Sequence, residues 1–101
     1  MPSFPAKDWA SSVHERLHSY PGLQHLRVRH RGDTLILESG PDDDAFAHAR
    51  LRRLSATLWT VEMPSRGGRW EPTAIRDNVD NAVVALTEQF GWTLEPVHGY
   101  P

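Results

Sequence analysis

The sequence predicts a two-layer α+β sandwich: a five-stranded antiparallel meander sheet with an N-terminal and a C-terminal helix on one face (order α-β-β-β-β-β-α). Apolar residues recur at helical spacing near each end of the chain and alternate with polar residues between those ends. Glycine, proline, aspartate and asparagine separate the alternating segments. With 101 residues, the chain is expected to form a single globular domain over 1-101, with a flexible tail from about residue 96.

Residues 5–20 are expected to form the first helix. Four apolar or aromatic residues recur there at helical spacing: Trp9, Val13, Leu17 and Tyr20. The Pro21-Gly22 pair should end this helix, because proline lacks the amide hydrogen that a continuing helix needs and glycine favours a turn.

A tight hairpin is predicted around residues 32–33, where glycine and aspartate interrupt two alternating segments. With a two-residue turn, Val28 faces Leu37 and Arg27 faces Glu38. Apolar then meets apolar on one face and arginine meets glutamate on the other, so the register is consistent with a sheet covered on one side.

A second hairpin is predicted across a three-residue turn at residues 55–57. That turn places Leu51 opposite Val61, Ala49 opposite Met63 and Arg50 opposite Glu62. The pattern of the first hairpin is therefore repeated, with the apolar pair and the charged pair on the same respective faces.

The fifth strand is expected to follow a turn around residues 67–68. Trp70 and Ala74 are predicted to face the core. Pro72 indicates that this strand lies at an edge of the sheet, because proline has no amide hydrogen for a second neighbouring strand.

The second helix is the clearest element, and its apolar face comprises Val79, Val83, Leu86 and Phe90. Asp77 is the expected N-cap and Gly91 the expected C-terminal glycine. Trp92 is expected to pack back on this helix, with Trp92 and Leu94 as an alternative short strand.

Both helices should cover the apolar face of the sheet, which is predicted to comprise Leu26, Val28, Leu35, Leu37, Leu51, Trp59, Val61, Met63 and Trp70. The opposite side is called the open face below. We expect it to be an interaction face of arginines and exposed aliphatic residues: Arg27, Arg29, Arg31, Ile36, Arg50, Arg52, Leu54 and Leu58.

Arginine beside exposed aliphatic groups is typical of protein interfaces, because the guanidinium group stacks and forms paired hydrogen bonds with carboxylates. The sequence therefore favours a small non-enzymatic protein-interaction or regulatory module, with a protein partner or self-association as a homodimer. One alternative is a nucleic-acid-binding domain that uses the same face, although the predicted face lacks the stacking aromatic residues of such domains. Another is a solvated face whose ion pairs serve no partner.

The stretch HERLH, residues 14–18, resembles the zinc-peptidase motif over five residues. In that motif two histidines hold zinc, so His14 and His18 are the candidate metal ligands. A zinc site also needs a third protein ligand, and no candidate stands at a recognised spacing. A zinc-dependent hydrolase is thus a second alternative, and we expect no catalytic residue, metal site or cofactor.

Two further motifs contain residues that are typical of binding sites. Residues 42–44 are three consecutive aspartates that suit Mg²⁺ or Ca²⁺ chemically, but the remainder of a calcium loop is missing. Residues 65–70, SRGGRW, carry the glycines and arginines of a phosphate-binding turn without a surrounding fingerprint. Both are interpreted as solvated turns.

Composition excludes several classes of site. The absence of cysteine rules out disulfides and thiolate metal sites. A formal net charge of −2 gives no overall attraction to nucleic acid or anionic lipid. No apolar run is long enough for a membrane span or a signal peptide, so a cytoplasmic location is expected. Ten arginines against one lysine are typical of a GC-rich bacterial genome.

Overall fold

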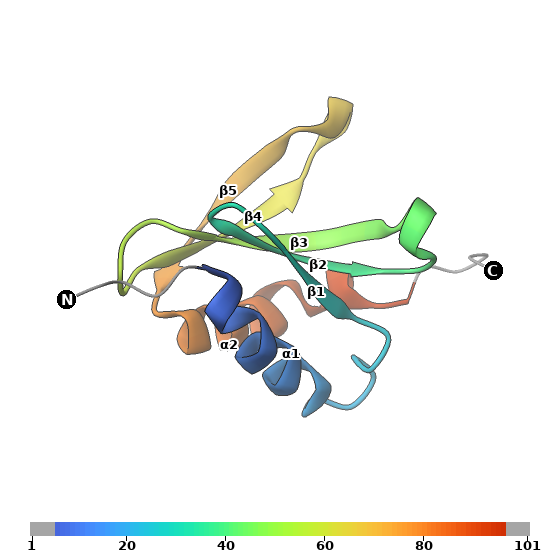
Figure 1. The fold of residues 1–101 in the computed structure, drawn as a ribbon, viewed down its shortest axis with the longest axis horizontal. Coiled ribbons are helices and arrows are strands. Elements are labelled where there is room, and N and C mark those ends of the chain that lie inside the picture. The colour runs from blue at the N-terminus through green and yellow to red at the C-terminus, as the bar shows by residue number, and fades with distance from the viewer. Residues whose placement is uncertain (1–5, 97–101) are drawn as a thin grey trace.

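The structure, a computed structural model, describes residues 6–96 and contains one antiparallel sheet in the order β1-β2-β3-β4-β5. The strands are β1 (Arg27–Arg31), β2 (Thr34–Ser39), β3 (Phe46–Arg53), β4 (Trp59–Pro64) and β5 (Trp70–Asp77). The α-helices are α1 (Ala10–His18) and α2 (Val79–Phe90). Both helices lie on the same side of the sheet (Figure 1), which confirms the predicted α+β sandwich and its element order.

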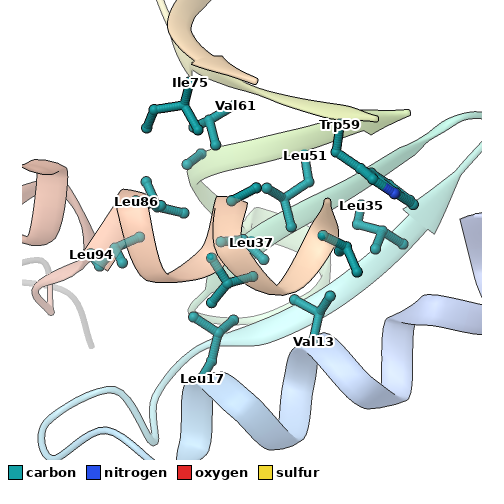
Figure 2. Close-up of a cluster of buried hydrophobic side chains, with 14 of the residues drawn as sticks. Val13, Leu17, Leu35, Leu37, Leu51, Trp59, Val61, Ile75, Leu86 and Leu94 are labelled. Atoms are coloured by element: carbon teal, nitrogen blue, oxygen red, sulfur yellow. The ribbon is translucent and has the colours of Figure 1, made fainter. Parts of the chain in front are cut away.

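The core lies between the sheet and the two helices. Leu17 from α1, Trp59 from β4 and Leu86 from α2 are each at most 1% exposed. Figure 2 shows these side chains meeting with apolar residues of every central strand beneath the sheet. Apolar and polar residues alternate along β2, β3 and β4, so the apolar residues of these strands lie on this side of the sheet. The two helices cover them without bringing charged side chains into the core.

The register of the first hairpin is confirmed, and that of the second is confirmed except for Ala49 and Met63, which were predicted to pair and do not. Val28 pairs with Leu37, and Arg27 pairs with Glu38, across a turn at residues 32–33. In the second hairpin Leu51 pairs with Val61 and Arg50 with Glu62. The three-residue turn is closed by the Leu54 amide, which donates to the Leu58 carbonyl at 2.8 Å.

The prediction for β5 was wrong about Trp70. A turn restricted to residues 67–68 would pair Ser65 with Trp70, whereas the observed turn also includes Arg66 and pairs Pro64 with Trp70. A shift of one residue moves every side chain to the other face, so Trp70 lies on the open face. Gly67 and Gly68 make the longer turn possible, because both adopt positive φ angles of 75° and 73°.

Ile75 enters the core from β5, where Ala74 had been expected. Ile75 is 7% exposed, whereas Ala74 is exposed. The cause is a bulge: Thr60 pairs with Arg76 and Glu62 pairs with Pro72, so β5 carries extra residues opposite Val61. The β4–β5 hairpin bends at this point and rises on the side away from the helices (Figure 1).

The N-terminal helix is shorter than predicted. The chain forms a 3-10 turn at Ala6–Trp9 before α1 begins at Ala10. The helix ends at His18, and the Ser19 amide donates to the carbonyls of the last turn. Pro5, the expected first-turn residue, lies outside the described residues.

Asn78, not Asp77, is the N-cap of α2. The Asn78 side chain accepts a hydrogen bond from the Asn81 amide at 2.8 Å, which satisfies one of the free amides of the first turn. Asp77 remains in β5 because it pairs with Trp59, and its carboxylate accepts from the Asn78 amide.

The segment after α2 also differs from expectation. Gly91 has a φ of −54°, so the chain continues in a right-handed 3-10 turn at Gly91–Leu94 and forms no strand there. This turn carries Leu94 into the core, at 0% exposure, and leaves Trp92 71% exposed instead of packed on the helix. The expected flexible tail falls largely on residues 97–101, which lie outside the described residues.

Candidate interaction face of the sheet

The pairing of the five strands aligns a row of arginines and threonines across the open face. Successive register pairs connect Arg31, Thr34, Arg52, Thr60 and Arg76. Neighbouring strands are about 4.8 Å apart, so the arginines of this row begin about 10 Å from one another. Together with Arg27, Arg29 and Arg50, the open face carries six arginines from three of its strands, β1, β3 and β5.

Glu38, in β2, is buried beneath this face. Its side chain is 6% exposed and lies between two arginines of β1. Arg29 donates from Nε to both carboxylate oxygens at 3.1 Å, and the Nε of Arg27 lies 3.4 Å from Oε1. A buried carboxylate requires such partners, because an unpaired charge loses its hydration without compensation.

Glu62, in β4, repeats the arrangement with two arginines of β3. Its side chain is 5% exposed. Arg50 donates to it from Nε, and Arg52 Nη1 lies 3.7 Å from its second oxygen. The two glutamates therefore hold four guanidinium groups in place, and the open face retains an excess of positive charge.

Arg31 and Arg76 differ from the other four arginines of the face. No carboxylate in the described part of the chain pairs with either of them. Both side chains are exposed, at opposite edge strands of the sheet. They are therefore the arginines best placed to meet an external anion.

Trp70 is the residue of this face that sequence reasoning missed. The guanidinium carbon of Arg50 lies 4.7 Å from the centroid of the Trp70 ring, within range of a cation–π contact. The prediction that all aromatic residues face the core was therefore wrong. The length of the turn before β5 decides this placement, and the sequence around the two glycines allows both lengths.

The aliphatic part of the predicted face is only partly exposed. Ile36 was expected to be accessible but is 5% exposed, because arginines stand opposite it on both neighbouring strands. Leu54 and Leu58, at the β3–β4 turn, are 45% and 36% exposed, as predicted. The accessible surface of the open face is thus mainly arginine.

The HERLH stretch brings its two histidines together without building a metal centre. The rings of His14 and His18 lie 3.9 Å apart between centroids, and His18 Nε2 donates to the Leu26 carbonyl at 2.7 Å. No third histidine or carboxylate joins them among residues 6–96. Arg16, inside the motif, lies 3.3 Å from Asp80 and links α1 to α2.

The aspartate run at 42–44 and the SRGGRW stretch at 65–70 form short turns. The aspartates at 42–44 form an exposed 3-10 turn, and Asp42 lies 3.5 Å from Arg27. The glycines at 67 and 68 lie at the tip of the β4–β5 hairpin, where Arg66 and Arg69 are exposed.

Two histidines, the buried His48 and the half-buried His25, hold the turn at Gly91–Leu94, called the C-terminal turn below, against the sheet. His48 Nδ1 donates to the Thr93 carbonyl at 2.7 Å, and His25 Nε2 donates to the Leu94 carbonyl at 2.6 Å. Because a carbonyl only accepts, the neutral His48 ring carries its proton on Nδ1, and Nε2 accepts from the Ser39 hydroxyl at 2.7 Å. Burial of His48 lowers its pKa, and the nearby His25 acts in the same direction.

The lowered pKa of His48 predicts a loss of stability in acid. Below the ordinary pKa of 6.5, His48 binds a proton in the unfolded chain but stays neutral in the folded chain. The free energy of unfolding therefore falls as pH falls. Denaturant titrations between about pH 7.5 and about pH 5.5 should show a shallower decline for His48→Gln than for the parent. His30→Gln, which alters an exposed histidine, should keep the parent's slope; an unchanged slope in His48→Gln would contradict the prediction.

The fold and its open face define a small α+β sandwich whose uncovered sheet face is arginine-rich. No family model, curated protein or solved structure matches the chain significantly. Within the described residues, no helix has the length and apolar character required to cross a membrane.

Proposed function

We propose that the protein is a small cytoplasmic, non-enzymatic interaction module that binds an acidic protein partner through its open face. The observation that supports this proposal is the segregation of charge. The face carries six arginines against two buried glutamates, although the whole chain has a net charge of −2. A local positive field of this kind accelerates association with an acidic surface and orients it.

The geometry of the arginines suits carboxylate partners. A guanidinium group presents its donors in a planar fork that matches a carboxylate. Glu38 and Glu62 already hold four of the guanidinium groups in place, so these arginine side chains lose less conformational freedom when a partner binds. Arg31 and Arg76 remain available at the two sides of the row.

A different protein is favoured over a second copy of this chain as the partner. Two copies that met through their open faces would bring arginine against arginine, and like charges across an interface oppose association. Acidic side chains on a partner would instead neutralise the row. Self-association through this face is therefore treated as an outcome of the test.

The test uses Arg31→Gln with Arg76→Gln, because neither arginine pairs with a carboxylate of the described chain. The matched control is Ser12→Glu with Gln89→Glu, two exposed helix positions that give the same change in net charge. Tagged parent and variants are used to capture host proteins, and the captured partner is then titrated directly. We expect parent-like folding in both variants and a loss of affinity of about tenfold or more in the arginine variant alone.

Three results would contradict this proposal. If the arginine variant retains every partner of the parent with unchanged affinity, the open face is only solvated surface. If both variants lose the partner equally, net charge rather than the face determines binding. If the parent is a dimer that the arginine variant converts to a monomer, the face binds a second copy.

A nucleic-acid-binding domain is the second candidate, and Trp70 favours it. Aromatic rings and arginines on an open sheet are the groups that stack on unpaired bases. The same variants are titrated with a single-stranded oligonucleotide at several salt concentrations. Binding that decreases steeply with salt and is lost in the arginine variant, with protein capture unchanged, would support this second candidate over the first.

A further inference from the structure

A pocket of about 430 Å³ lies between the sheet and the turn at Gly91–Leu94. It forms where β3 and β4 separate: their register pairs begin at Arg50 and Glu62, and none joins Phe46–Ala49 to Met63 or Pro64. The C-terminal turn forms the opposite wall. Its volume lies within the range of small-molecule binding sites.

Aromatic side chains dominate the pocket. Phe46, Phe90 and Trp92 all line it, together with Met63. Phe46 is 43% exposed and Trp92 is 71% exposed, so two large apolar side chains face water at the same site. Neighbouring exposed apolar groups of this size are typical of a surface that binds something.

The described lining of the pocket contains a carboxylate and no lysine or arginine. Glu95 is the one charged residue among the described residues that line it. His48 uses both ring nitrogens, on Ser39 and Thr93, and burial lowers its pKa, so it offers no positive charge.

Aromatic faces attract cations because the π-electron density is negative above the ring. A carboxylate beside such rings strengthens the attraction and disfavours anions. We propose that this pocket binds a small organic cation, an alkylated ammonium group carried on an apolar body. The aromatic residues contact the body and the methyl groups, and Glu95 neutralises the charge.

The probe for this proposal is benzyltrimethylammonium, titrated into ¹⁵N-labelled protein and followed by amide and indole chemical shifts. We expect saturable shifts at Phe46, Trp92 and Glu95, with a Kd of about 1 mM or tighter. Phenylacetate and benzyl alcohol, which carry the same ring with negative or no charge, should bind at least about tenfold more weakly. Equal binding of the three compounds would show that charge does not select the ligand and would overturn the proposal.

Two variants connect the binding to the named residues. Trp92→Ala should weaken benzyltrimethylammonium about tenfold, and Glu95→Gln about threefold, without affecting folding because both side chains are exposed. Glu88→Gln, an exposed carboxylate on α2 outside the pocket, should bind as the parent does. Parent-like binding in both pocket variants would place the cation elsewhere, and the absence of saturable shifts in the parent would equally reject the site.

A capped tripeptide that carries trimethyl-lysine tests whether the natural ligand is a free small molecule or part of a modified protein. We expect it to bind no more tightly than the free cation, since the proposal concerns a free small molecule. Binding at least about tenfold tighter would instead identify a segment of a modified protein as the occupant.

Discussion

Replacing Trp59 by alanine is expected to lower the free energy of unfolding by about 3–5 kcal/mol. Trp59 is 1% exposed and contributes the largest fully buried side chain of the described core. Its removal loses the apolar contacts of the indole and leaves a cavity that the surrounding β-sheet cannot close. Equilibrium unfolding in denaturant measures the change.

The chain supplies a matched control for this prediction. Trp92→Ala deletes the same atoms from a side chain that is 71% exposed, so it should alter stability by no more than about 0.5 kcal/mol. A loss below about 0.5 kcal/mol in Trp59→Ala, or equal losses in the two variants, would mean that β4 faces the core with its other side.

Arg50→Ala is expected to cost about 2 kcal/mol, a large effect for an arginine at a protein surface. The reason is Glu62, whose side chain is 5% exposed and would lose its closest partner. Arg52, at 3.7 Å, remains and limits the loss. The contact of Arg50 with Trp70 would also disappear.

Arg31→Ala makes the same chemical change on the same face and should cost no more than about 0.5 kcal/mol, because Arg31 pairs with no carboxylate of the described chain. Adding Glu62→Gln to Arg50→Ala should recover part of the loss, since the buried group then carries no charge. Equal costs for Arg31→Ala and Arg50→Ala would show that Glu62 does not depend on Arg50. Thermal or denaturant unfolding of the four chains completes the comparison.

The alternation of apolar and polar residues determines which side of each central strand faces the core. Val28, Leu37, Leu51 and Val61 alternate with polar residues, and a buried face allows only one parity for such strands. The inward position of Trp59 follows from the same alternation. Local pattern and turn length together therefore determine the first two hairpins and the helix-covered face.

The misplaced residues depend on interactions that a linear pattern does not contain. Trp70 faces outward because its turn has three residues, and Ile75 faces inward because of a bulge opposite Val61. Leu94 fills the core because the chain continues to coil after α2, and two histidines distant in sequence hold that turn. Each outcome results from a competition between local geometries that tertiary packing decides.

The sequence predicts which arginines lie on the open face, but it does not predict that the glutamates between them are buried. The alternation of β1 and β3 places Arg29 and Arg50 on one face, as expected from the sequence. The burial of Glu38 and Glu62 beneath these arginines emerges only when long side chains of neighbouring strands cover them. For this reason Arg50, and with it Arg29, serves folding as well as surface charge, and Arg31 and Arg76 are the better probes of binding.

The two outermost strands have a consequence for solubility at high concentration. The unpaired edge of a sheet can form hydrogen bonds with a strand of another molecule, and repeated addition of strands leads to aggregates. β1 carries three arginines in five residues, so a second β1 beside it would be repelled. β5 contains Pro72, which lacks an amide hydrogen, and a bulge that bends the strand. Both edge strands therefore carry features that oppose growth into fibrils.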